Sequence, residues 1–158
     1  MFWQYGRGRF GNSWRRKRTW VFRMLQIKRS DRRPILRLVQ RRNKETLVPI
    51  IKKHVKRHSL VVGDEWRAYA GLATEGYRHV RVNHSQHYVD PQTGLHIQNL
   101  ERAWKTYKKE IWRMRGNRSE KALKEQLCFI EWTYWLARKN SEGDLGRLVK
   151  DIRRSYQT

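Results

Sequence analysis

Two acidic residues lie at positions in the predicted fold where a carboxylate could bind a metal ion. Asp64 directly follows Ser59–Gly63 (SLVVG), a short, continuously apolar run that is typical of a strand buried on both faces. Because ligand sites in open α/β sheets form at the carboxyl ends of strands, a carboxylate here is a candidate ligand for a divalent metal ion. On position alone the simpler interpretation is favoured, since an Asp after a strand is often just the N-cap of the segment that follows.

Glu101 is the second candidate. The helix predicted over about His96–Arg115 has one apolar stripe, with Glu101 near its edge, where a carboxylate can point at the end of a neighbouring strand. Lys105, Lys108 and Trp112 share that side of the helix, and an acid beside two cations suits a metal next to a phosphate backbone. The alternative is a surface ion pair between Glu101 and Lys105, worth roughly 0.2–0.5 kcal/mol. The stripe consists of Ile97, Leu100, Trp104, Tyr107, Ile111 and Met114.

The charge balance indicates the class of partner. The 158 residues contain 37 Lys and Arg against 14 Asp and Glu, a formal net charge of +23. A compact domain with this charge repels itself and favours a polyanionic binding partner. Hydrophobic residues make up 38% and there are 8 Trp, so a folded core is expected rather than a disordered basic tail. No apolar run reaches the roughly 18 residues that span a bilayer, and the N-terminus lacks a signal-peptide layout. We therefore expect an intracellular protein that faces nucleic acid and not membrane.

The predicted elements place these residues in a mixed α/β fold with helices packed on a sheet. Asn43 is expected to cap the first predicted helix, and Asn117, with Glu120 three positions later, to start the last one. Cys128 is the only cysteine, which excludes intrachain disulfides, and its apolar surroundings predict a buried core residue. The predicted strands are Thr19–Lys28, Pro34–Gln40 with Pro34 at its first position, Ser59–Gly63 and Tyr77–Val82, and the predicted helices are Lys44–His58 with an awkward Pro49, His96–Arg115 and Ser119–Lys139.

Three regions follow from this pattern: a flexible, basic, Gly/Arg-rich lead-in over 1–18, a folded core over 19–140, and a basic amphipathic tail over 141–158. Basic residues of the lead-in and of the helix that carries Glu101 are expected to contact phosphates, which positions a protein on nucleic acid without reading its sequence. These residues are Arg7, Arg9, Arg15, Arg16, Lys17, Arg18, Lys105 and Lys108.

The two carboxylates lie in motifs that resemble those of the Merlin-type DDE transposases and their bacterial insertion-sequence relatives. The resemblance covers about residues 5–137 and is carried by the following segments: Glu45–Ile51 (ETLVPII), Val61–Tyr69 (VVGDEWRAY), Val82–Ser85 (VNHS), Val89–Pro91 (VDP), Thr93-Gly94, His96, Gln98-Asn99, Glu101 and Arg113–Gly116 (RMRG).

The resemblance implies an RNase H-like mixed sheet flanked by helices, in which three acids bind two divalent metals, usually Mg²⁺, for cleavage and strand transfer of DNA. Asp64 then matches the second acid and Glu101 the third. By the same resemblance, His84, His96 and Asn99 line the catalytic pocket. The histidines of this region are irregularly spaced and no cysteine lies among them, which argues against a structural zinc site.

The first acid is where the sequence departs from the family pattern. Trp3–Arg9 resembles the stretch that follows the first acid, and no Asp or Glu occurs before Asp31, which the pattern places in a hairpin turn. We therefore expect an N-terminally truncated core, with its first strand missing or trimmed and its strand-transfer activity lost or impaired. The alternative is a non-enzymatic, transposase-derived DNA-binding protein. A mobile-element origin, possible homo-oligomers, and a nuclear location in a eukaryote, or the cytoplasm and nucleoid otherwise, are further expectations.

Overall fold

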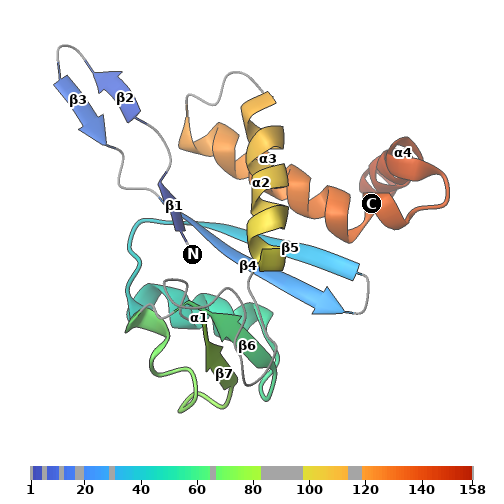
Figure 1. Cartoon of the computed structure of the whole chain (residues 1–158). Helices are drawn as coiled ribbons and strands as arrows, with labels where there is room; N and C mark the ends of the chain where they lie inside the picture. The colour runs from blue at the N-terminus through green and yellow to red at the C-terminus, as the bar shows by residue number, and fades with distance from the viewer. Residues whose placement is uncertain are drawn as a thin grey trace. The chain divides into compact units, whose positions relative to one another are not determined.

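Three small β-sheets and four α-helices make up the described part of the chain, a mixed α/β arrangement (Figure 1). The computed structural model describes residues 2–4, 7–10, 13–16, 20–28, 31–64, 67–82, 98–113 and 119–157. The chain divides into two compact units, one made of Met1–Phe22 with Leu38–Trp104 and the other of Arg23–Arg37 with Lys105–Thr158. Among the described helices, none is long and apolar enough to cross a membrane.

The three-stranded sheet has the order β1-β4-β5, with β1 at Phe2–Gln4, β4 at Trp20–Lys28 and β5 at Asp31–Val39. β1 has three residues and is antiparallel to β4. The predicted strand over Thr19–Lys28 is confirmed. The prediction for Pro34 was wrong, because β5 begins three residues earlier and Pro34 lies inside it. An edge strand tolerates proline, since the missing N–H is not needed on its open side.

Side chains of α3 (Glu120–Trp135) cover the backbone of edge strand β5. The backbone N–H of Leu36 donates to the Glu131 carboxylate, which also accepts from Arg37 at 2.6 Å. The Trp135 indole N–H donates to the Pro34 carbonyl at 2.7 Å. These bonds occupy backbone groups that would otherwise offer a template for pairing with another chain. Apolar residues of the same helix are buried, namely Leu123, Leu127 and Ile130.

Glu131→Ala is expected to destabilise the protein by about 1–3 kcal/mol, because it leaves the Leu36 N–H without its acceptor and removes the carboxylate partner of Arg37, which keeps the Leu36 carbonyl. Urea denaturation followed by circular dichroism measures the change. Glu125→Ala is the matched control, since Glu125 is an exposed glutamate on the same helix. Equal stability of the two variants would show that the contact with β5 contributes nothing.

The basic lead-in is more regular than its composition suggests. Arg7–Phe10 (β2) and Ser13–Arg16 (β3) form a two-stranded antiparallel sheet, with Arg7 opposite Arg16 and Gly8 opposite Arg15. These residues form paired strands, which the sequence did not predict. The pairing fixes the spacing of the arginine backbone positions.

Within its unit, Asp64 lies among α1 (Lys44–His54), the parallel strands β6 (Leu60–Gly63) and β7 (Arg78–Arg81), and a 3₁₀ turn, η1 (Arg67–Tyr69). α1 ends four residues earlier than predicted. The Asn43 side chain does not bond the helix backbone and instead accepts from the Thr46 hydroxyl at 2.6 Å. The core includes Leu47, Val48, Ile51, Tyr69, Leu72, Tyr77 and Val82.

β6 is only partly buried, contrary to the prediction of a strand buried on both faces. Leu60 is 45% exposed, and the other three residues of the strand are half-buried. The reason is the sheet itself: among the described residues β6 pairs with β7 alone, so it is not the central strand of a larger sheet.

The helical predictions hold in outline. α2 runs over Gln98–Arg113. Of the described stripe residues, Trp104, Tyr107 and Ile111 are buried as predicted, and Leu100 is half-buried. α3 is capped by Ser119, whose hydroxyl accepts from the Ala122 N–H at 3.1 Å; the expected cap, Asn117, lies outside the described residues. Cys128 is exposed, which corrects the prediction of a core residue.

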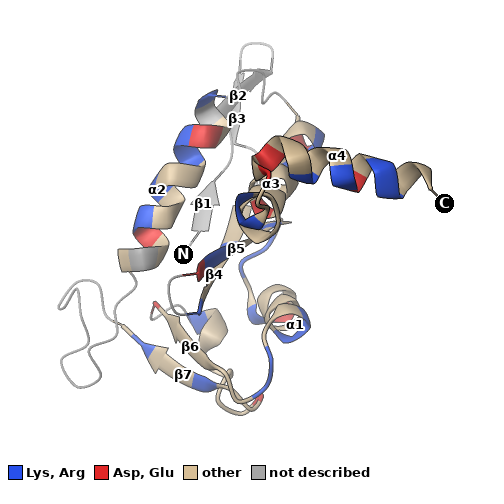
Figure 2. Cartoon of the chain, turned by 90° about the vertical axis from the view of Figure 1, so that its right-hand side faces the viewer, with Lys and Arg blue, Asp and Glu red and all other residues tan. Residues whose placement is uncertain are grey.

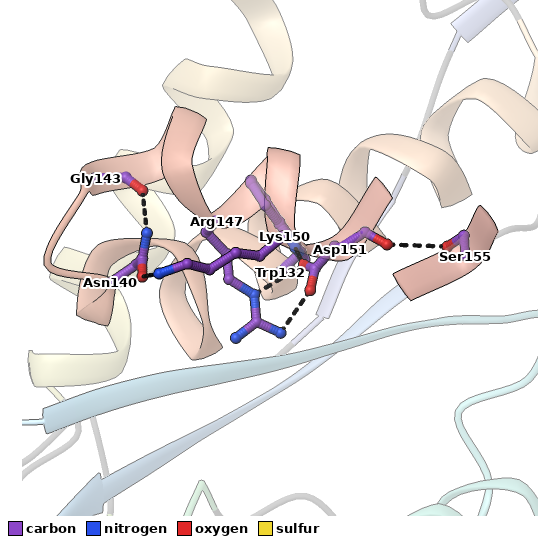
Figure 3. Close-up of polar contacts among 7 residues, drawn as sticks. All are labelled: Trp132, Asn140, Gly143, Arg147, Lys150, Asp151 and Ser155. Carbon is purple, nitrogen blue, oxygen red and sulfur yellow. Dashed lines mark hydrogen bonds and ion pairs between the residues drawn. The ribbon is translucent and has the colours of Figure 1, made fainter. Parts of the chain in front are cut away.

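The tail is helical, and it is joined to α3 by polar contacts (Figure 3). η2 (Ala137–Lys139) leads into α4 (Gly143–Tyr156). The Asp151 carboxylate accepts from the Trp132 indole N–H at 2.8 Å and pairs with Arg147 at 2.8 Å. These contacts lower the pKa of Asp151, chiefly through the hydrogen bond from Arg147.

Candidate active site

Asp64 lies where the sequence placed it, immediately after the last residue of β6. β6 and β7 run parallel with Gly63 opposite Arg81, and the Val82 N–H donates to the Gly63 carbonyl at 2.9 Å. The two strands therefore end side by side, and the half-buried Asp64 side chain projects from this carboxyl edge. This is the edge at which α/β sheets position ligand-binding groups.

Two rings pack against the strand end that precedes Asp64. A Cβ atom added to Gly63 would lie 3.6 Å from His79 Nε2 and 3.8 Å from Tyr69 Cδ2. The Tyr69 and His79 rings meet edge to face, with centroids 6.3 Å apart. Tyr69 is buried, and its ring also lies 6.5 Å from that of Phe22. The backbone before Asp64 is thus held between β7 and an aromatic wall.

His79 is a site residue that the sequence did not single out. Burial lowers its pKa, Arg81 lowers it further, and Asp64 opposes both by raising it. The imidazole is therefore neutral near pH 7, and its Nε2 atom is buried without a hydrogen-bond partner among the described residues. The alternation in Tyr77–Val82 predicted the strand, but only the packing over Gly63 shows that this histidine faces the site.

Glu101 lies in the first turn of α2, where the positive end of the helix dipole favours a carboxylate. It belongs to the same compact unit as Asp64. Its Oε1 atom is buried and, among the described residues, has no hydrogen-bond partner. That oxygen does not form the surface ion pair with Lys105 considered above, so the alternative reading of Glu101 loses its main support.

The two acids present, Asp64 and Glu101, are chemically suited to a single divalent cation. Carboxylate oxygens are the ligands that Mg²⁺ prefers, and it usually takes one or two of them and keeps several waters. A buried glutamate oxygen without a partner suits such a role. Within the described part of the chain, no three His, Cys, Asp or Glu side chains form a group that could hold a metal ion.

Asp31, the first acid in the sequence, is occupied elsewhere. Its carboxylate pairs with Lys139 and, at 2.7 Å, with Arg33. The hydrogen bond from Lys139 is the main cause of a lowered pKa. Asp31 is the first residue of β5 and not part of the turn that the sequence predicted, and its carboxylate pairs within its own unit.

The remaining predicted site residues are described unevenly. His84, His96, Lys17 and Arg18 lie outside the described residues, and of Asn99 only the helical backbone is described. Arg7 and Arg9 lie on β2, and Arg15 and Arg16 on β3. Lys105 is exposed on α2 and Lys108 is half-buried there, along a helix rich in basic residues (Figure 2).

Fold and site together define a mixed α/β protein with one carboxylate at the end of a parallel strand and another on a helix. The family model of the ISXO2-like transposase domain matches residues 4–129, and the chain belongs to this family. The match includes both carboxylates and ends before α4.

A curated relative supports the same family. An uncharacterized transposase-like protein of Haemophilus influenzae is 32% identical over 71 residues, which cover 45% of this chain and 56% of that protein. The chain thus spans about half the length of the curated relative it matches. No solved structure matches.

Proposed function

We propose that this chain is the catalytic domain of a DNA transposase with an RNase H-like fold, in which Asp64 and Glu101 are the second and third metal-binding carboxylates. The observation that carries the proposal is the buried, unpartnered Oε1 atom of Glu101. The chain has 37 Lys and Arg against 14 acidic residues, so basic partners for that oxygen are plentiful. Among the described residues, none donates a hydrogen bond to it. A buried polar atom left unpaired is typical of a functional position.

The cofactor of the proposed activity is a divalent metal, Mg²⁺ in the first instance. When bound, it would activate a water or a 3′-hydroxyl for attack on a DNA phosphodiester. Asp64 and Glu101 would hold it, His79 and Tyr69 would fix the strand end that carries Asp64, and neutral His79 would add no positive charge beside the cation.

Two acids support metal binding better than they support strand transfer. No Asp or Glu precedes Asp31, and Asp31 is held by Lys139 and Arg33. We therefore propose that the 158-residue polypeptide binds duplex DNA and a divalent cation but does not transfer strands. A second candidate, a non-enzymatic DNA-binding protein derived from a transposase, is favoured by the same shortage of acids. The nucleus of a eukaryote, or the nucleoid otherwise, is the compartment such a protein would occupy.

Asp64→Asn is expected to weaken Mn²⁺ binding at least about tenfold, since even the loss of a group behind a metal ligand commonly costs 10–100-fold. Isothermal titration calorimetry with Mn²⁺, used as a probe for Mg²⁺, measures the change. Asp144→Asn is the matched control, because Asp144 is an exposed aspartate on α4.

Equal Mn²⁺ affinity in both variants would remove Asp64 from the proposed site. A nicking assay on duplex DNA then tests activity. Metal-dependent cleavage by the 158-residue polypeptide, abolished by Asp64→Asn, would show that the missing acid is not required and that the proposed inactivity is wrong.

A further inference from the structure

α4 carries an apolar stripe that remains exposed. Leu145 is 77% exposed, Leu148 44%, Val149 46%, Ile152 46% and Tyr156 88%. Their spacing of three, four, seven and eleven residues from Leu145 places all five on one face of the helix. No residue of α4 is buried, so the stripe is not part of the core of its unit.

The other face of α4 is the one that docks. Asp151 accepts from Trp132 of α3 at 2.8 Å, and Arg147 reinforces Asp151 within the helix (Figure 3). Lys150 donates to Asn140 at 3.3 Å, and the Asn140 amide donates to the Gly143 carbonyl at 3.1 Å. The polar face is therefore fixed against the rest of the unit, and the apolar face is directed away from it.

The stripe is not explained by the proposed activity, because the transposase-domain match ends at residue 129. A contiguous exposed apolar surface of this kind marks an interaction site. The question is which partner fits it.

The charges of α4 favour a second copy of the same helix in the opposite direction. Glu142 and Asp144 lie at its N-terminal end, and Arg153 and Arg154 in its last turn. Antiparallel pairing sets each acidic end beside a basic end and opposes the two helix dipoles, whereas parallel pairing sets like charges together.

The spacing of the stripe residues is also compatible with a two-fold symmetric pair of helices. A two-fold axis between Leu148 and Val149 pairs these two residues across the interface and pairs Leu145 with Ile152 of the other copy. Glu142 and Arg153 are about three helical turns apart on the same flank of the stripe. The same axis therefore brings Glu142 of one copy near Arg153 of the other.

We propose that α4 is a self-association helix, through which two copies of the chain pair antiparallel by the stripe Leu145, Leu148, Val149, Ile152 and Tyr156. The helix has 14 residues, a length of about 21 Å, so the contact belongs to the small, transient class below about 1,200 Å². The dimer is accordingly concentration-dependent, and two chains bound to one DNA molecule would form it more readily.

Sedimentation velocity over roughly a hundredfold range of protein concentration, without DNA or metal, tests the proposal. The wild-type chain is expected to shift from monomer to dimer. Leu148→Glu places a charge in the middle of the stripe and is expected to weaken association at least about tenfold. Gln157→Glu makes the same charge change at an exposed position outside the stripe and should weaken association by no more than the factor of about two to five expected of a single exposed charge. Circular dichroism checks that both variants remain folded.

A charge exchange tests the direction of pairing. Glu142→Arg and Arg153→Glu are each expected to weaken self-association about two- to fivefold, the range for exposed ion pairs. Mixing the two variants should restore association, because each copy then meets the opposite charge at both positions. A monomeric wild type over the whole range, or an unaffected Leu148→Glu variant, would overturn the proposal. So would a wild type that stays monomeric while binding anionic lipid vesicles through the stripe. None of these outcomes depends on Asp64, Glu101 or DNA binding.

Discussion

Raising the salt concentration from about 50 to about 200 mM is expected to weaken binding of this chain to duplex DNA by about 10³-fold or more. The 37 Lys and Arg residues are offset by only 14 acids, which leaves a formal net charge of +23. A protein that contacts roughly 6–10 phosphates releases a corresponding number of counterions. Fluorescence anisotropy with a labelled duplex, repeated over a salt series, gives the slope of log affinity against log salt. A flat salt dependence would mean that this charge does not serve DNA binding.

The β2–β3 sheet is the first place to seek those contacts. The double variant Arg7→Ser with Arg9→Ser is expected to reduce the slope by about two, close to one phosphate per arginine. Lys121→Ser with Lys124→Ser removes the same charge from exposed positions on α3 and should leave the slope unchanged. A reduced slope in the second variant only would move the DNA-binding surface away from the sheet.

The parts of the fold that could be predicted are those in which local pattern and burial agree. β4 and α2 were found within two residues of their predicted bounds. β4 is rich in β-branched and aromatic residues, and the apolar positions of α2 recur with a helical period that places Trp104, Tyr107 and Ile111 in the core. Asp64 was located correctly because a strand followed by an acid is a local signal. The prediction of a fully buried β6 was wrong, since the number of strands that flank a strand is set by pairing far along the chain.

Other features depended on signals that were weak or misread. The dipeptide Gly11-Asn12 between β2 and β3 is a hairpin signal, but the many arginines around it suggested a loop. Cys128 sits in an apolar run, yet helical periodicity puts Leu123, Leu127 and Ile130 on the buried face and leaves Cys128 off it. His79 has no distinguishing sequence context, because its role arises from a contact with Gly63 on another strand.

The strongest link between the site and stability is expected at Glu101. Mn²⁺ at about 100 times its dissociation constant should stabilise the wild-type protein by about 2.7 kcal/mol, because a ligand that binds only the folded state shifts unfolding by mass action. Glu101→Gln should abolish this stabilisation. Without metal, the same variant should be more stable than wild type by about 1 kcal/mol, since a buried carboxylate oxygen without a partner carries a desolvation cost. Urea denaturation with and without Mn²⁺ measures both effects.

Glu45→Gln is the control that distinguishes metal binding at Glu101 from the general effect of an acid near a helix N-terminus. Glu45 is an exposed acid in the first turn of α1, as Glu101 is an acid in the first turn of α2. Its replacement should cost roughly 0.3–1 kcal/mol with or without Mn²⁺, because only the favourable interaction with the helix N-terminus is lost. If Glu101→Gln behaves in the same way, Glu101 is an ordinary first-turn acid and not a metal ligand. The proposal is supported if Glu101→Gln raises the free energy of unfolding and abolishes the response to Mn²⁺, while Glu45→Gln lowers that free energy and keeps the response. The unpartnered oxygen of Glu101 would then serve a function that is kept at a cost in stability.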